Sequence, residues 1–95
     1  MLTIVNTSIF KSLYNRERIK DFILNNRLKN IGCNIRNIRK QKQIPQIDLA
    51  VAIGIDRAYL SEIENGHTNV SVNILYAIAD ALNTDIVELF NKKGE

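Results

Sequence analysis

The sequence predicts an all-α fold, and three observations lead to that prediction. Apolar residues recur at every third or fourth position along most of the chain, which is the spacing of one face of an α-helix. Only four glycines and one proline interrupt the 95 residues, so long helices can form. Residues 2–5 have the composition of a strand, but no second strand is evident to pair with them.

The first 42 residues predict two helices. In the range 13–24, Ile19, Phe22 and Ile23 share one helical face, and the two asparagines at 25 and 26 are expected to end that helix. A second helix follows and ends near residue 42. Its apolar stripe is Leu28, Ile31, Ile35 and Ile38, and its polar face is Asn34, Arg36, Asn37 and Lys40.

Two short helices joined by a tight turn are predicted between residues 46 and 65. The first, 46–53, ends at Gly54, which suits the left-handed position that follows a helix. Asp56 can cap the second, 57–65, by accepting hydrogen bonds from the free amides of its first turn, and Gly66 ends it. The residues expected to be buried are Leu49, Ala50, Ile53, Leu60 and Ile63.

Two further helices complete the predicted fold. Ser71 is a good cap for a helix that Asn83 can end in the left-handed conformation, and Thr84 or Asp85 opens a short last helix. Their inward residues are Ile74, Leu75, Ile78, Ala79 and Leu82, then Ile86, Leu89 and Phe90. We therefore expect a partly helical extension at 1–29, a domain at 30–91 and a frayed tail at 92–95.

Composition excludes several classes of protein. No apolar run approaches the roughly 18 residues of a membrane span, so we expect no membrane partner. The single cysteine, Cys33, cannot form an internal disulfide, which fits a cytoplasmic protein, and we expect it to be half-buried. We find no metal-spaced cluster, phosphate-binding loop or nucleophile with a base, so neither a cofactor nor an enzyme is expected.

The charge is unevenly distributed along the chain. Residues 1–42 carry ten Lys/Arg and two Asp/Glu, whereas residues 43–95 carry three and eight. A basic half suggests an anionic partner. Any such attraction must come from Arg36, Lys40, Lys42 and the first 29 residues, which hold six Lys/Arg.

From residue 31 to residue 90 the chain resembles the Cro/C1-type helix-turn-helix family, also called the XRE family. The resemblance rests on the combination and order of Gln46, Leu49, Ala50, Gly54, Leu60, Ile63, Glu64 and Gly66. It implies a five-helix, lambda repressor-like DNA-binding domain, here with an additional N-terminal helical segment. In such a domain the second helix of the motif enters the major groove.

The resemblance implies base contacts from the first, second and sixth residues of the recognition helix, 57–65, and in some members from the third. Arg57 can fork onto guanine, Ala58 can touch a thymine methyl group, and Glu62 can accept from cytosine. Tyr59 is the fourth candidate, along the sugar-phosphate backbone or in plain surface packing. Arg57 can instead be an ordinary exposed arginine, and Glu62 can be a solvated acid or can orient an arginine.

The resemblance also implies contacts to the DNA backbone. Gln46 corresponds to a glutamine that holds a phosphate at a helix N-terminus, which is already a site for anions. Asn65, His67 and Asn69 lie in the loop that follows the recognition helix, where they would donate hydrogen bonds. His67 can equally be a plain surface histidine.

Three positions carry structural expectations from the same resemblance. Arg39 corresponds to an arginine that pairs with the acid at the end of the recognition helix, here Glu64. Gln43 stands where the family usually has Gly or Asn, so a left-handed conformation there would be strained. Pro45 replaces the usual Ser or Thr cap of the helix 46–53, which removes the side-chain cap.

The leading functional hypothesis is a transcriptional regulator that binds a palindromic operator in double-stranded DNA as a homodimer. Restriction-modification controllers are one class of regulator with this resemblance. The alternative is a protein-interaction module such as an antitoxin, with a toxin or polymerase as partner. The extension 1–29 can pack on the core, extend a dimer or form a DNA arm, and its apolar stripe favours the first two. Ile86, Leu89 and Phe90 either complete the core or form the dimer surface.

Overall fold

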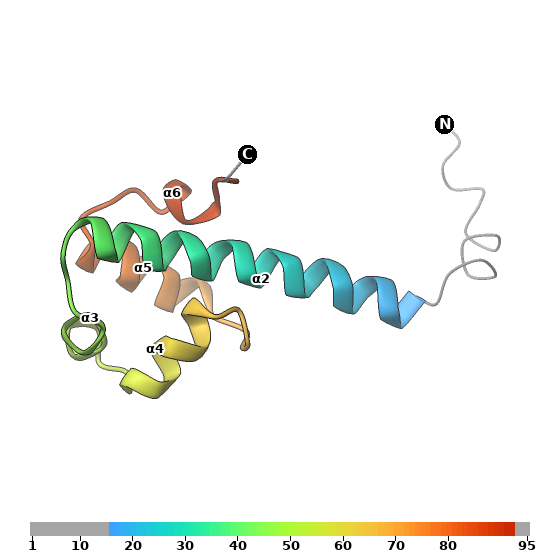
Figure 1. The fold of residues 1–95 in the computed structure, drawn as a ribbon, viewed down its shortest axis with the longest axis horizontal. Coiled ribbons are helices and arrows are strands. Elements are labelled where there is room, and N and C mark those ends of the chain that lie inside the picture. Colours follow the sequence, from blue (N-terminus) through green and yellow to red (C-terminus); the bar gives the residue numbers. More distant parts are fainter. Residues whose placement is uncertain (1–15, 93–95) are drawn as a thin grey trace.

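The computed structural model describes residues 16–92, and this part of the chain is entirely helical (Figure 1). No strand occurs between residues 16 and 92, which confirms the predicted fold class. The strand-like residues 2–5, and the predicted helical residues 13–15, lie outside the described range. The helices are α2 (Arg16–Gln41), α3 (Gln46–Ile53), α4 (Arg57–Glu64), α5 (Val72–Ala81) and α6 (Val87–Phe90).

Helix α2 is one continuous helix of 26 residues, roughly 39 Å long at 1.5 Å per residue. The predicted break at Asn25 and Asn26 is therefore wrong. Asparagine lowers helix stability only by a few tenths of a kcal/mol, roughly 0.7 at most. The neighbouring leucine, arginine and lysine residues are good helix formers, and their preference outweighs that cost.

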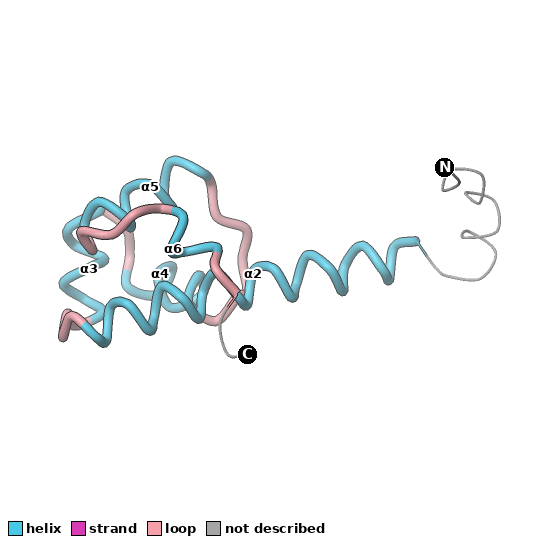
Figure 2. The backbone as a smooth tube through the Cα atoms, turned by 90° about the horizontal axis from the view of Figure 1, so that it is seen from above, coloured by secondary structure: helices cyan, strands magenta, loops and turns pink. Residues whose placement is uncertain are grey.

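The N-terminal part of α2 extends beyond the other helices (Figures 1 and 2). Phe22 is 66% exposed and Ile23 is 41% exposed, so these two apolar residues of the extension do not pack on the core. Of the three uses left open for the extension, packing on the core is wrong for Phe22 and Ile23. The apolar stripe that suggested it lies on the projecting part of α2.

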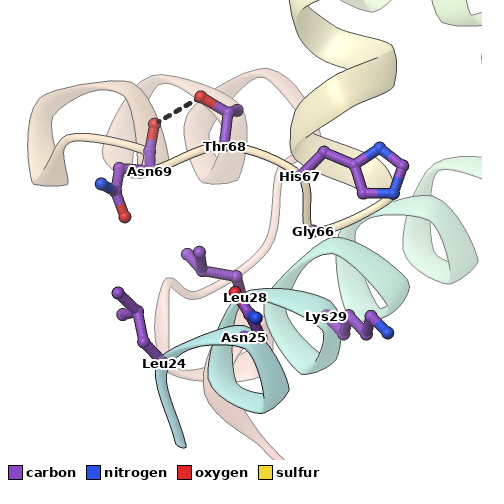
Figure 3. A pocket seen from close by; sticks show the side chains of 8 residues that line it. All are labelled: Leu24, Asn25, Leu28, Lys29, Gly66, His67, Thr68 and Asn69. Carbon is purple, nitrogen blue, oxygen red and sulfur yellow. Dashed lines mark hydrogen bonds between the residues drawn. The ribbon is translucent and has the colours of Figure 1, made fainter. Parts of the chain in front are cut away.

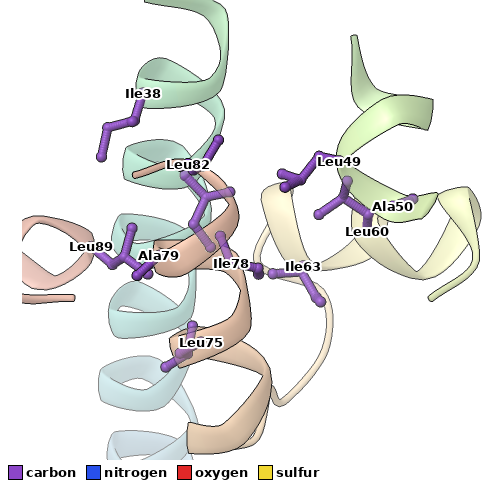
Figure 4. Packing of buried hydrophobic residues seen from close by; sticks show 11 residues of the cluster. Ile38, Leu49, Ala50, Leu60, Ile63, Leu75, Ile78, Ala79, Leu82 and Leu89 are labelled. Carbon is purple, nitrogen blue, oxygen red and sulfur yellow. The ribbon is translucent and has the colours of Figure 1, made fainter. Parts of the chain in front are cut away.

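The core lies between the C-terminal part of α2 and the four shorter helices (Figure 4). Most of the predicted inward residues are buried. Ile53, Ile74 and Ile86 are only partly buried, and Phe90 is 49% exposed. The buried apolar residues are Ile35, Ile38, Leu49, Ala50, Leu60, Ile63, Leu75, Ile78, Ala79, Leu82 and Leu89.

Two residues of α2 differ in burial from their expectations. Asn34 is fully buried, and its Nδ2 donates to the carbonyl oxygens of Leu89 (2.9 Å) and Asn91 (2.6 Å). It lies four residues before Ile38 and three after Ile31, on the side that faces α6. Cys33, expected to be half-buried, is exposed. Asn34 thus ties the end of α6 to α2.

The turns between helices follow the predicted positions. Gly54 adopts φ 74°, and its N–H donates to the carbonyls of Ala50 and Val51. Ser71 caps α5, because its Oγ accepts from the N–H of Ile74 at 3.2 Å. Asp56 occupies the position before α4 but makes no side-chain capping bond, contrary to expectation. Asn83 is left-handed at φ 54°, as predicted.

The turn between α2 and α3 contains a left-handed residue although none of its residues is a glycine. Gln43 adopts φ 59°, a conformation that costs a non-glycine residue about 1 kcal/mol. Pro45 occupies the position before α3 with φ −64°, and no side chain caps that helix. The strain at Gln43 is retained because its neighbours hold the turn: the N–H of Ile44 donates to the carbonyl of Arg39 at 3.1 Å.

Glycine at position 43 is expected to relieve this strain. We expect Gln43→Gly to raise the free energy of unfolding by about 0.5–1 kcal/mol, after the added entropy of the unfolded chain is subtracted. Urea unfolding followed by far-UV circular dichroism measures the change. Gln41→Gly, in the last residue of α2, is the matched control and should destabilise. Equal destabilisation by both variants would contradict the strain at residue 43.

Candidate nucleic-acid interface

Helix α4 has one face that packs on the core and one face that carries predicted site residues. Leu60, Ile63 and Glu64 face inward and are each 3% exposed or less. On the other side, Arg57, Ala58 and Glu62 are exposed. The structure therefore places these three predicted base-contacting residues together on the solvent face of α4.

The remaining predicted residues lie around this face. Tyr59 is only half-buried and packs against the core cluster, so part of its surface serves the fold. Gln46 opens α3 and is half-buried. Asn65, His67 and Asn69 are exposed in the segment that follows α4. Their contact with DNA stays a prediction.

The pairing of Arg39 with Glu64 is confirmed. The Nε and NH2 atoms of Arg39 lie 2.7 and 2.9 Å from the two carboxylate oxygens of Glu64. Arg39 is 8% exposed and Glu64 is 3% exposed. Two parallel charge-assisted hydrogen bonds of this kind hold both side chains in one orientation. NH1 of Arg39 also donates to the carbonyl of Ile44 at 3.0 Å.

Two further side chains, Gln46 and Arg36, also contact Glu64. The Nε2 of Gln46 donates to Oε1 of Glu64 at 3.1 Å. The Nε of Arg36 lies 3.7 Å from the same oxygen, and its NH2 donates to the carbonyl of Glu64 at 3.3 Å. One of the two amide hydrogens of Gln46 is therefore used inside the protein, and its contact with a phosphate stays a prediction.

Two glycines allow the end of α4 to lie directly against α2. A Cβ atom on Gly32 would overlap the carbonyl oxygens of Ile63 and Glu64. On Gly66, which has φ 72°, it would lie 2.6 Å from Cα of Lys29. The sequence reasoning missed the role of Gly32. A glycine inside a helix lowers helix stability by about 1 kcal/mol relative to alanine, and it usually has a packing reason. The presence of Gly32 inside a predicted helix could therefore have indicated a close contact there.

None of the helices within residues 16–92 combines the length and the apolar character that crossing a membrane requires.

Loss of the buried ion pair is expected to destabilise the domain strongly. Arg39→Ala leaves the carboxylate of Glu64 buried without its main partner, which costs about 3–5 kcal/mol. Arg36→Ala is the matched control, because its side chain is 34% exposed and contacts Glu64 at 3.7 Å. It should cost less than about 1 kcal/mol. Urea unfolding of both variants distinguishes them, and similar values would contradict a structural role for Arg39.

Comparisons with known proteins agree with this geometry. Residues 35–89, more than half of the chain, match the HTH_3 helix-turn-helix family model. The ImmF control region 10 kDa protein of Bacillus phage phi105 is 41% identical over 58 residues, which are 61% of this chain and 64% of that protein. The chain thus matches slightly less than two thirds of that relative.

Two solved structures of restriction-modification controller proteins have the same fold. C.AhdI from Aeromonas hydrophila aligns with TM-score 0.64 and 36% identity, over 66% of this chain and 96% of its own. The C.Esp1396I tetramer in complex with its natural 35 base-pair operator aligns with TM-score 0.60 and 33% identity, over 66% and 83%. The chain belongs to the HTH_3 helix-turn-helix family, the Cro/C1-type family of DNA-binding regulators.

Proposed function

We propose that this protein is a sequence-specific transcriptional regulator that binds a palindromic operator as a homodimer, with α4 in the major groove. The observation that carries the proposal is the division of α4 into two faces. One face is locked to the core through Leu60, Ile63 and Glu64, and the other presents Arg57, Ala58 and Glu62 to solvent.

The dimensions of α4 suit this role. An α-helix with its side chains is about 10–12 Å across, and the major groove is about 12 Å wide. Recognition helices contact base edges with their N-terminal residues. Arg57 is the first residue of α4 and Ala58 the second, so they would reach the floor of the groove first.

The three exposed side chains have complementary chemistry. The guanidinium group of Arg57 can donate two hydrogen bonds to O6 and N7 of guanine. Ala58 is small enough to contact a thymine methyl group, and the carboxylate of Glu62 can accept from N4 of cytosine. Each good pair would contribute about 1–3 kcal/mol of discrimination against a wrong base.

Backbone contacts would come from both sides of α4. Within the described residues no side chain caps α3, so the amides of Gln46 and Ile47 are open to a phosphate, whereas that of Asp48 donates to the carbonyl of Pro45 at 3.0 Å. On the far side, Asn65, His67 and Asn69 supply donors in an exposed loop. These contacts would set the depth and angle of α4 in the groove.

A homodimer is proposed because one short helix reads only a few base pairs, and two-fold symmetry doubles the site. The likeness to a controller protein solved as a tetramer on its operator supports self-association. Exposed apolar residues offer contact area, with Phe90 on α6 and Phe22 and Ile23 on α2. Likeness to C.AhdI favours a controller of restriction-modification genes as the narrower function.

Selection of bound sequences from random duplexes tests the proposal. We expect a palindrome to be enriched by the wild-type protein. Arg57→Ala should lose preference at one position of each half-site, by about 1–3 kcal/mol in a binding titration. Lys20→Ala, on the extension of α2, is the control and should keep the full consensus.

Failure to enrich any sequence would contradict DNA reading. It would instead favour a protein-interaction module of the antitoxin kind. A consensus that survives Arg57→Ala unchanged would remove Arg57 from the reading residues.

A further inference from the structure

A hollow lies between the N-terminal part of α2 and the loop that follows α4 (Figure 3). Its polar lining consists of Asn25 and Lys29 from α2 and residues 67–69 from the loop. Every one of these polar groups can donate a hydrogen bond, and no acidic residue of the described chain lines the hollow. The hollow therefore has the chemistry of a site for an anion.

Lys29 is held against this loop by the backbone. Gly66 approaches α2 so closely that a Cβ atom there would lie 2.7 Å from Cγ of Lys29. Leu24 and Leu28 complete the hollow beneath the loop. Figure 3 shows the side chains of Lys29 and His67 extending to the same side. Lys29 thus lies beside the loop that carries residues predicted to contact DNA, His67 among them.

Arg36 brings a second positive charge to the start of the same loop. It lies seven residues after Lys29, two turns along one face of α2. Its NH2 donates to Oδ1 of Asn65 at 2.5 Å. Because that bond uses the acceptor of Asn65, the Nδ2 hydrogens remain for another acceptor, such as a phosphate oxygen.

Several other cations of the described chain lie elsewhere, although Lys40, eleven residues after Lys29, shares its face of α2 at 100° per residue. Arg27 and Lys92 line a second hollow, between α2 and α6, which Lys29 also borders. Lys42 donates to the carbonyl of Asn83 at 3.4 Å, at the end of α5. Lys20 is nine residues from Lys29, half a turn around the helix at 100° per residue.

We propose that Lys29 and Arg36 bind the DNA backbone beside the loop 65–69, so that the contact surface extends along α2 beyond the segment matched by the family model. The inference rests on the proposed function. It supplies the positive charge that the acidic surroundings of α4 lack, because Asp56 and Glu62 accompany Arg57 there. Asp21, one turn before Asn25, limits this surface towards the N-terminus.

Lys29→Gln is the test, because Lys29 is exposed and removal of its charge leaves the core intact. Each phosphate contact contributes about −0.9 to the slope of log affinity against log salt, so loss from both subunits should reduce the slope by about 1.8. Between about 50 and about 200 mM potassium chloride, the loss of affinity should then be about tenfold smaller than for wild type. Both a selected duplex and a mixed-sequence duplex serve as probes.

Matched controls remove the same charge from the other side of α2. Lys20→Gln and Arg27→Gln should leave the salt slope unchanged, whereas Lys29→Arg should retain it. Lys29→Gln should also keep the sequence preference of the wild-type protein, because a phosphate contact carries no base information.

The outcomes separate this inference from the proposed function. If the wild-type protein shows no salt-dependent binding to either duplex, the proposed function fails. If it binds, and Lys29→Gln has the slope of Lys20→Gln, the inference about Lys29 is overturned while the proposed function stands. An altered consensus in Lys29→Gln would also contradict a backbone contact.

Discussion

The bidentate pair between Arg39 and Glu64 is the interaction on which the rest of the structure depends. Glu64 ends α4, Arg39 lies in α2, and Gln46 at the start of α3 donates to the same carboxylate. One buried carboxylate thus fixes the relative orientation of three helices. It lies behind the exposed face of α4, so the residues on that face can change without loss of the support beneath them.

The same carboxylate changes how the charge of the protein is to be counted. Arg39 is neutralised inside the domain, and Arg36 lies 3.7 Å from Glu64 with part of its side chain in solvent. The formal charge of the basic half therefore exceeds the charge that an approaching polyanion meets. Basic residues without a carboxylate partner in the described structure, such as Lys29, therefore contribute most of the attraction for a polyanion.

Local signals in the sequence predicted most of the fold, and the exceptions have physical causes. Gly54, Ser71 and Asn83 act within a few residues of their position, so their roles could be inferred. The burial of Asn34 depends on carbonyl groups 55 and 57 residues away, and the role of Gly32 depends on the end of α4. The break predicted in α2 at Asn25 gave too much weight to the low helix preference of asparagine. That preference is too weak to end a helix. For the candidate site, the exposed face of α4 and the Arg39–Glu64 pair followed from the family pattern. The contribution of Lys29 required the path of the loop in space.

The unbroken course of α2 couples its two ends mechanically. Residues 16–27 stand about 18 Å along the same rod that holds Arg36 and Arg39 against α4. The number of residues in such a helix sets both how far its N-terminal end lies from the core and in which direction around the helix axis it points. Each residue gained or lost within it would turn everything upstream by about 100°, and would swing that end to another side of the domain. The length of this segment therefore sets the direction in which the protein reaches beyond its own core.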